Sequence, residues 1–127
     1  MLLGDLFIVD TLESGDGFLK AALRIRPEHR IFDGHFPGRP VLPGACLVQL
    51  IQELAAAATR ADLQLATAGP VKFIAMVRPQ VNGSLQVSAR IDPAESGYLR
   101  VVAEAMQAEE VCFRFTGTFR EGSDYAG

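Results

Sequence analysis

One segment of the chain, residues 43–60, has to be enclosed by the rest of the protein. Its larger apolar residues recur at the i, i+3, i+4, i+7 spacing of a helix, at Leu47, Leu50, Ile51 and Leu54. The alanines at 55–58 add the strongest helix former. Few polar residues remain to face solvent, and a helix that is apolar nearly all round is covered nearly all round. We therefore expect one buried helix, from about Pro43 to Arg60, with the other elements packed against it.

The segments available to cover this helix alternate apolar and polar residues with the period of two typical of half-buried strands. The first spans residues 19–26, and residues 6–9 are expected to be its hairpin partner across a turn at 14–17. Segments 85–91, 99–105 and 111–119, joined by turns at 92–97 and 108–110, predict an antiparallel meander. A shorter strand is expected over 71–77, bounded by Gly69-Pro70 and Pro79.

Together these elements predict a single α+β domain over residues 1–127, with an antiparallel sheet wrapped around one central helix, which is the hotdog fold. The polar end, residues 121–127, is expected to be a flexible tail. The phenylalanines at 113, 115 and 119 are expected in the core, and His29 is expected to be exposed at a strand end.

Composition and charge exclude several classes of partner. The formal net charge is −3, and the 12 Lys and Arg residues form no basic stripe, so nucleic acid is not expected to bind. No apolar run approaches the ~20 residues that cross a bilayer. The N-terminus has no basic region ahead of an apolar stretch, so we expect a cytoplasmic protein without a membrane partner. Cys46 and Cys112 are expected to be reduced and buried, and no metal site is predicted.

Residues 34–44, directly before the helix, read Gly-His-Phe-Pro-Gly-Arg-Pro-Val-Leu-Pro-Gly and carry the chemistry. Their prolines and glycines fix a rigid path, and His35 is the side chain in it that can exchange a proton near neutral pH. At Gly44 the first helical turn presents free N–H groups and the positive end of the helix dipole, which stabilise an oxygen that gains negative charge. A base and an oxyanion site in one segment favour proton removal beside a thioester carbonyl. Without that context, a lone His would be interpreted as a structural hydrogen-bonding residue.

The segment from His35 to Gly44 resembles the signature of the FabA/FabZ-type β-hydroxyacyl-acyl carrier protein dehydratases, His-Phe-Pro-Gly-x-Pro-(aliphatic)-(aliphatic)-Pro-Gly, at every fixed position. The stretch from Pro70 to Gly83 is similar to that family more loosely. The resemblance implies a hotdog homodimer in which the His of one subunit faces an acidic residue on the central helix of the other. It also implies syn removal of water from a (3R)-3-hydroxyacyl thioester on an acyl carrier protein, with no cofactor.

Carried over residue by residue, the resemblance implies that His35 takes the C2 proton, that the carbonyl of Val41 orients its ring, and that the N–H of Gly44 polarises the thioester carbonyl. The remaining residues expected to line the substrate path are Phe36, Pro37, Gly38, Pro43 and Cys46. For Cys46, a buried or path-lining thiol is favoured over a nucleophile.

The chain departs from the signature where the family has its catalytic Glu or Asp, five residues after Gly44, because Gln49 stands there. An amide binds water or a hydroxyl but gives up no proton at useful pH. We expect Gln49 to position water while His35 performs most of the proton transfer. Glu53, on the same helical face and where the family has Gln, and Asp33, two residues before His35, are alternative proton donors, and Glu53 is alternatively a polar residue at a dimer seam.

Three functions remain open at this stage. The first is a 3-hydroxyacyl-[acyl carrier protein] dehydratase in fatty acid or polyketide-like biosynthesis. The second is a catalytically impaired acyl-thioester-binding or scaffold subunit, in a heterodimer whose partner supplies the missing acid. The third is a hotdog thioesterase. The sequence does not favour it, because no carboxylate is obviously placed to activate water.

Overall fold

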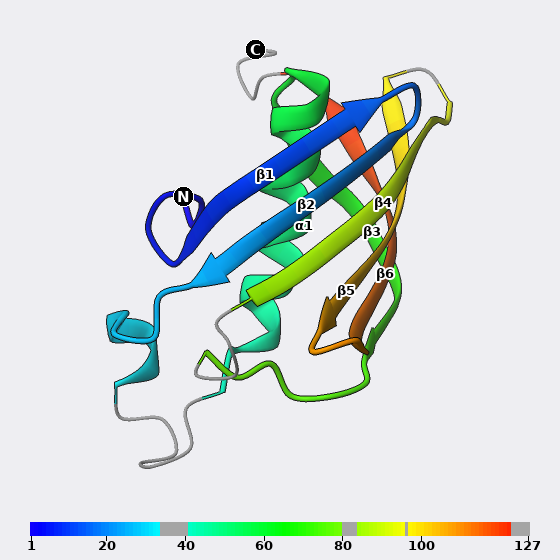
Figure 1. Cartoon of the computed structure of the whole chain (residues 1–127). Helices are drawn as coiled ribbons and strands as arrows, with labels where there is room; N and C mark the ends of the chain where they lie inside the picture. The colour runs from blue at the N-terminus through cyan, green and yellow to red at the C-terminus, as the bar shows by residue number, and fades with distance from the viewer. Residues whose placement is uncertain (34–40, 80–83, 96, 123–127) are drawn as a thin grey trace.

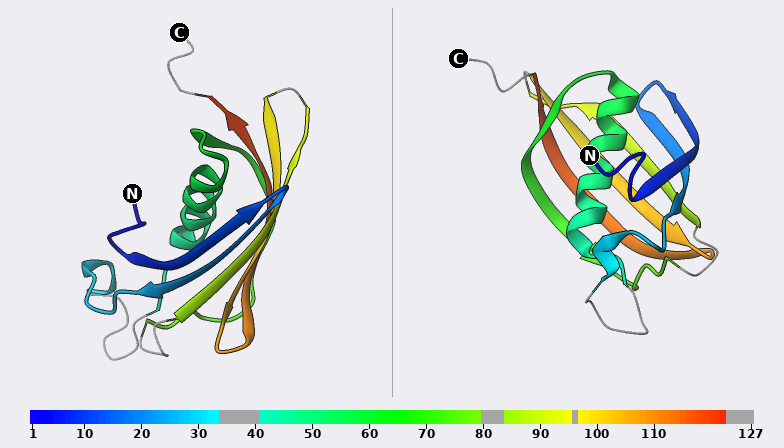
Figure 2. Two further views of the ribbon diagram at one scale, coloured as in Figure 1. Left: turned by 45° about the horizontal axis from the view of Figure 1, so that its top comes forward. Right: turned by 90° about the vertical axis from the view of Figure 1, so that its left-hand side faces the viewer.

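The computed structural model describes residues 1–33, 41–79, 84–95 and 97–122. In this part of the chain, six antiparallel strands form one sheet in the order β1-β2-β4-β5-β6-β3, and one α-helix lies against it. Figures 1 and 2 show the helix in the hollow of the strongly curved sheet. The elements are β1 (Phe7–Gly15), β2 (Phe18–Ile25), the 3-10 helix η1 (Arg30–Phe32), α1 (Gly44–Thr59), β3 (Leu63–Phe73), β4 (Ser84–Pro93), β5 (Tyr98–Gln107) and β6 (Glu110–Glu121). The predicted hotdog architecture is confirmed.

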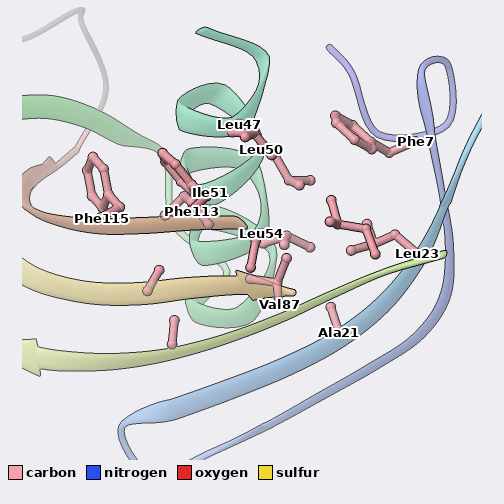
Figure 3. Packing of buried hydrophobic residues seen from close by; sticks show 14 of the residues in the cluster. Phe7, Ala21, Leu23, Leu47, Leu50, Ile51, Leu54, Val87, Phe113 and Phe115 are labelled. Carbon is pink, nitrogen blue, oxygen red and sulfur yellow. The ribbon is translucent and has the colours of Figure 1, made fainter. Parts of the chain in front are cut away.

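The helix α1 begins one residue after, and ends one residue before, the predicted limits. Arg60 closes it in a left-handed conformation, with φ 55° and ψ 39°. Figure 3 shows apolar side chains of the helix, the first strands and β6 meeting in one cluster. Leu50, Leu54 and Ala55 have no exposed surface. No helix among the described residues is long and apolar enough to cross a membrane.

The sheet lines the hollow with one face of each predicted alternation. Small residues fill positions on its middle strands, since Ala89 of β4 is paired with Ala103 of β5 and both are buried. Short side chains leave room for a helix to approach a concave surface without voids or overlap. Phe113, Phe115 and Phe119 of β6 are buried as predicted, and their rings follow one another at 6.4 and 6.0 Å between centroids.

The prediction for β3 was wrong in its limits. The strand runs from Leu63 to Phe73 rather than over 71–77, and it continues through Gly69-Pro70, where its register with β6 shifts between Ala68 and Val71. A bulge at Pro is tolerated here because β3 is an edge strand, and no other strand in the described part of the chain pairs with its outer side. After Phe73, the N–H groups of Ile74 and Ala75 still donate to the Cys112 carbonyl of β6. Further on, the Val77 carbonyl accepts a hydrogen bond from the Leu42 N–H, just ahead of α1.

Two smaller expectations also need correction. Glu121 belongs to β6 and so is not part of a flexible tail, and residues 123–127 lie outside the described part of the chain. His29 is not exposed, because only 13% of its side chain is accessible. Its Nδ1 accepts a hydrogen bond from the Ile31 N–H at 3.0 Å and caps η1, so Nε2 donates to Asp5 at 3.0 Å. That hydrogen bond lowers the pKa of Asp5.

Candidate functional site

The predicted site divides into a part that the structure describes and a part that it does not. His35, Phe36, Pro37 and Gly38 fall within residues 34–40, which lie outside the described residues. The described part begins at Val41, which is half-buried, and continues through Leu42, which is buried. The N–H of Leu42 donates to the carbonyl of Val77 at 2.9 Å. This bond joins the C-terminal end of the predicted catalytic loop to the segment that follows β3.

The start of α1 lacks the side-chain cap that most helices have. Pro43 is the N-cap residue, with φ −61° and ψ 140°, and it has no side chain able to accept a hydrogen bond. The first turn also contains no acidic residue. Its one capping contact among the backbone groups described here is from the Cys46 N–H to the Pro43 carbonyl, at 3.0 Å. No side chain of this first turn therefore neutralises the positive end of the helix dipole, which lies at Gly44.

Phe73 lies directly against Gly44 and was not among the predicted site residues. A Cβ placed on Gly44 would come within 2.6 Å of the Phe73 ring, so glycine allows this close approach. The ring also packs on Phe113 at 5.3 Å between centroids, yet 58% of Phe73 is exposed. The apolar end of β3 thus forms one wall of the helix start. The sequence could not indicate this role, because Phe73 is an ordinary apolar residue of a strand and no sequence pattern relates it to residue 44.

Gln49 and Glu53 lie together on α1, as their spacing predicts, and form a direct hydrogen bond. The Gln49 Nε2 donates to Glu53 Oε2 at 2.8 Å. Gln49 is exposed, whereas Glu53 is buried, with 8% of its surface accessible. The Leu2 N–H donates to both Glu53 oxygens at 2.9 Å, and the Leu3 N–H donates to Oε1 at 2.9 Å. The carboxylate is enclosed by the N-terminal segment of its own chain, which lies beside α1 in Figure 2.

The other predicted groups at this end of the molecule differ in accessibility. Asp33, the alternative acid, is exposed and closes η1 through its N–H to the Arg30 carbonyl at 2.9 Å. Cys46 is a free, buried cysteine, as is Cys112, in agreement with the prediction. Burial raises the pKa of the Cys46 thiol, although a position near a helix start commonly lowers it. A thiol kept protonated is a poor nucleophile, which supports an apolar role for Cys46.

A separate groove of about 650 Å³ lies on the outer face of the sheet, away from α1. It is lined by residues of β2, β3, β4, β5 and β6, among them Lys20, Lys72, Arg90, Glu104 and Arg114. None of the predicted site residues lines it. Within the described ranges, no three His, Cys, Asp or Glu side chains are grouped so that they could hold a metal ion.

Three comparisons place this arrangement among known proteins. The family model described as "ApeI-like: ApeI dehydratase" matches residues 12–117. The chain is 29% identical over 97 residues to the 3-hydroxyacyl-[acyl-carrier-protein] dehydratase FabZ of Caulobacter vibrioides, covering 75% of this chain and 55% of that protein. It is 32% identical over 94 residues to FabZ of Rhizorhabdus wittichii, covering 65% and 60%. The chain therefore spans little more than half the length of these curated relatives.

Among solved structures, the dehydratase heterocomplex ApeI:P from Xenorhabdus doucetiae superposes with a TM-score of 0.67 at 20% identity. The match covers 91% of this chain and 97% of that one. At this identity the likeness concerns the fold, and it agrees with the arrangement of sheet and helix in Figure 1.

Proposed function

The chain belongs to the ApeI-like dehydratase family, and from this premise we propose that it removes water from a (3R)-3-hydroxyacyl group held as a thioester on an acyl carrier protein. The product is the trans-2-enoyl thioester. The observation that carries the proposal is the helix start at Gly44, which has no side-chain cap and follows directly on the segment containing His35. A free N–H at the positive end of a helix is suited to hold a carbonyl oxygen as it gains charge.

Each residue then has a defined task. His35 takes a proton from C2, and the Val41 carbonyl holds the ring in the orientation for this. The Gly44 N–H binds the thioester oxygen, while Phe73 covers one side of the approach to it. Gln49 on the central helix of the second chain of the dimer binds the 3-hydroxyl group or the water that it becomes. Phe36, Pro37, Gly38, Pro43 and Cys46 line the path of the acyl chain.

The missing carboxylic acid limits the rate but does not prevent the reaction. Loss of a general acid costs about 10²- to 10⁴-fold, so the chain is expected to be slower than a relative with Glu or Asp at this position. A syn elimination places the C2 hydrogen and the 3-hydroxyl on the same face of the substrate. One imidazole can therefore accept the first proton and return it to the departing oxygen.

Mass spectrometry of the acyl carrier protein tests the reaction directly. Purified chain is mixed with a 3-hydroxyacyl carrier substrate, and loss of one water from the acyl group is followed with time. His35→Ala is expected to abolish the loss. His29→Asn provides the matched control, because it replaces the other histidine of the chain and asparagine can still cap η1. Equal rates for wild type and His35→Ala would exclude the role of His35, and no loss of water with wild type, alone or with a second hotdog chain, would exclude this function.

A dimer through β3 forms part of the proposal. Among the described residues no strand pairs with the outer edge of β3, whose one charged residue is Lys72 near its end. Exposed apolar residues continue along this edge and beyond it, at Leu65, Phe73, Ile74 and Met76. The opposite edge, β1, carries Asp10 and Glu13. Because charged edge strands resist pairing and apolar ones invite it, we expect a second hotdog chain to join β3 rather than β1.

The second candidate function follows from Gln49 together with this open edge. The chain would then be the acid-deficient subunit of a heterodimer, and the ApeI:P structure, which shares the fold, is a dehydratase heterocomplex. Multi-angle light scattering of the chain alone, together with the dehydration assay, distinguishes the two cases. A homodimer that dehydrates the substrate supports the first function, whereas activity that appears only after a second hotdog chain is added supports the second.

A further inference from the structure

The carboxylate of Glu53 has its accepting positions occupied by protein N–H groups. Three donors converge on it: the Leu2 N–H, the Leu3 N–H and the Gln49 amide, all at 2.8 to 2.9 Å. The side chain is 8% exposed, so water has little access to compete with them. The Glu53 side chain therefore serves as the hydrogen-bond acceptor for all three groups.

This arrangement decides how the neighbouring amide must point. A carboxylate only accepts hydrogen bonds, so the nitrogen of Gln49, and not its oxygen, faces Glu53. Gln49 itself is exposed, and its Oε1 is left for a group on the open side of the helix. We propose that Glu53 is a positioning residue that fixes Gln49 with its carbonyl oxygen toward the substrate. This inference rests on the proposed function and assigns a role within the same site.

The amide oxygen of Gln49 can only accept hydrogen bonds, and this decides which group supplies the proton for the departing water. Gln49 Oε1 accepts a hydrogen bond from the 3-hydroxyl of the substrate and holds it, but provides no proton. His35 takes the C2 proton, the C2–C3 double bond forms, and the C3–O bond breaks. The imidazolium returns its proton to the departing oxygen, so that one water and the enoyl thioester are released and the imidazole is neutral again. The pair thus serves to orient the hydroxyl, while both proton transfers pass through His35.

Glu53→Gln is the variant that tests the positioning role. The new amide can still accept from the N-terminal N–H groups, but it can also donate to Gln49 and allow that side chain to turn over. We expect kcat to fall about tenfold with KM changed less than twofold, since the variant holds the hydroxyl less well in the transition state than wild type does. The double variant Gln49→Glu/Glu53→Gln restores the family order of carboxylate and amide, and it is expected to exceed Glu53→Gln in kcat by tenfold or more.

The side-chain amide signals of Gln49 in a 15N-correlated NMR spectrum give a readout that does not require turnover. In wild type, one amide proton is expected to be shifted downfield and to exchange slowly because of its bond to Glu53, and Glu53→Gln is expected to remove both properties. Gln52→Ala is the matched control, because Gln52 lies on the same helix but donates to the Leu63 carbonyl at 2.8 Å. It should lower stability without moving the Gln49 signals.

The outcomes separate this inference from the proposed function. Gln49 signals that are the same in wild type and Glu53→Gln overturn the positioning role, as does an unchanged kcat in that variant. If wild type produces no enoyl product with any acyl substrate or partner, the proposed function fails, and the amide signals alone decide whether Glu53 fixes Gln49.

Discussion

Replacing Gly44 with alanine separates the folding role of the helix start from its chemical role. Gly44 is not among the residues with positive φ, so alanine fits its backbone, and Gly→Ala at such a site gains about 0.4–1 kcal/mol. The added Cβ would stand 2.6 Å from Phe73 Cε1 and 2.8 Å from Cζ. Since comfortable contacts are 3.5–4.0 Å, the ring has to move by about 1 Å.

The cost of that movement is limited by the exposure of Phe73, which leaves the ring free on one side. Loss of part of its packing on Phe113 costs about 0.5–1.5 kcal/mol. The two contributions nearly cancel, so the free energy of unfolding of Gly44→Ala should lie within about 1 kcal/mol of wild type. The methyl group, however, obstructs the approach of the thioester oxygen to the N–H. We expect kcat/KM to fall about 10²-fold, the usual loss of one oxyanion donor.

Urea unfolding and steady-state dehydration measure the two quantities on the same preparation. The double variant Gly44→Ala/Phe73→Leu relieves the overlap but keeps the Cβ, so activity should stay low even if packing recovers. A folded Gly44→Ala with wild-type kcat/KM would refute the role of this N–H. A loss of more than about 3 kcal/mol would refute the packing argument, because it exceeds the cost of shifting an exposed ring.

Three further predictions concern other parts of the molecule. Glu109→Gly should raise the free energy of unfolding by about 1 kcal/mol in urea titration, because Ala108 and Glu109 both have positive φ in the β5–β6 turn; unchanged stability would contradict this. Cys46, whose pKa is raised by burial, should react with iodoacetamide at pH 8 at least about tenfold more slowly than in denaturant. Because the pKa of the Cys46 thiol is higher in the folded than in the unfolded chain, its contribution to the free energy of unfolding is fully present below the unfolded pKa. That contribution is lost as pH rises through the folded pKa. Rapid labelling of the folded chain would show that the thiol is accessible. Leu65→Lys on β3 should shift the mass in light scattering from dimer to monomer, whereas Val9→Lys on β1 should not, and equal effects would rule out the β3 edge.

The elements with a clear period could be predicted from the sequence. The helix was predicted to within one residue at each end, because its apolar spacing stops where Pro43 and Arg60 interrupt it. The alternations of β2, β4, β5 and β6 identified their buried faces correctly. The limits of β3 were wrong, because Gly69-Pro70 was interpreted as a boundary. Only the position of the strand at the sheet edge allows it to pass through that pair.

The site was less accessible from the sequence. Four-residue spacing predicted that Gln49 and Glu53 share a face, and their hydrogen bond agrees with this. The two N-terminal N–H groups that occupy Glu53 lie about fifty residues away in the chain and carry no side-chain signal. Phe73 at Gly44 is likewise a tertiary contact of an ordinary apolar strand residue. Backbone donors and ring contacts of this kind depend on the folded arrangement, so no local pattern could indicate them.

The central claim is that His35 moves the C2 proton beside a carbonyl held at the start of α1. Its most direct test runs the reaction in reverse, hydrating a trans-2-enoyl carrier thioester in D₂O and locating deuterium in the product by NMR. Wild type is expected to place one deuteron at C2 of the 3-hydroxyacyl group, and His35→Ala is expected to form no such product. Deuterium incorporation by His35→Ala at the wild-type rate would contradict the account.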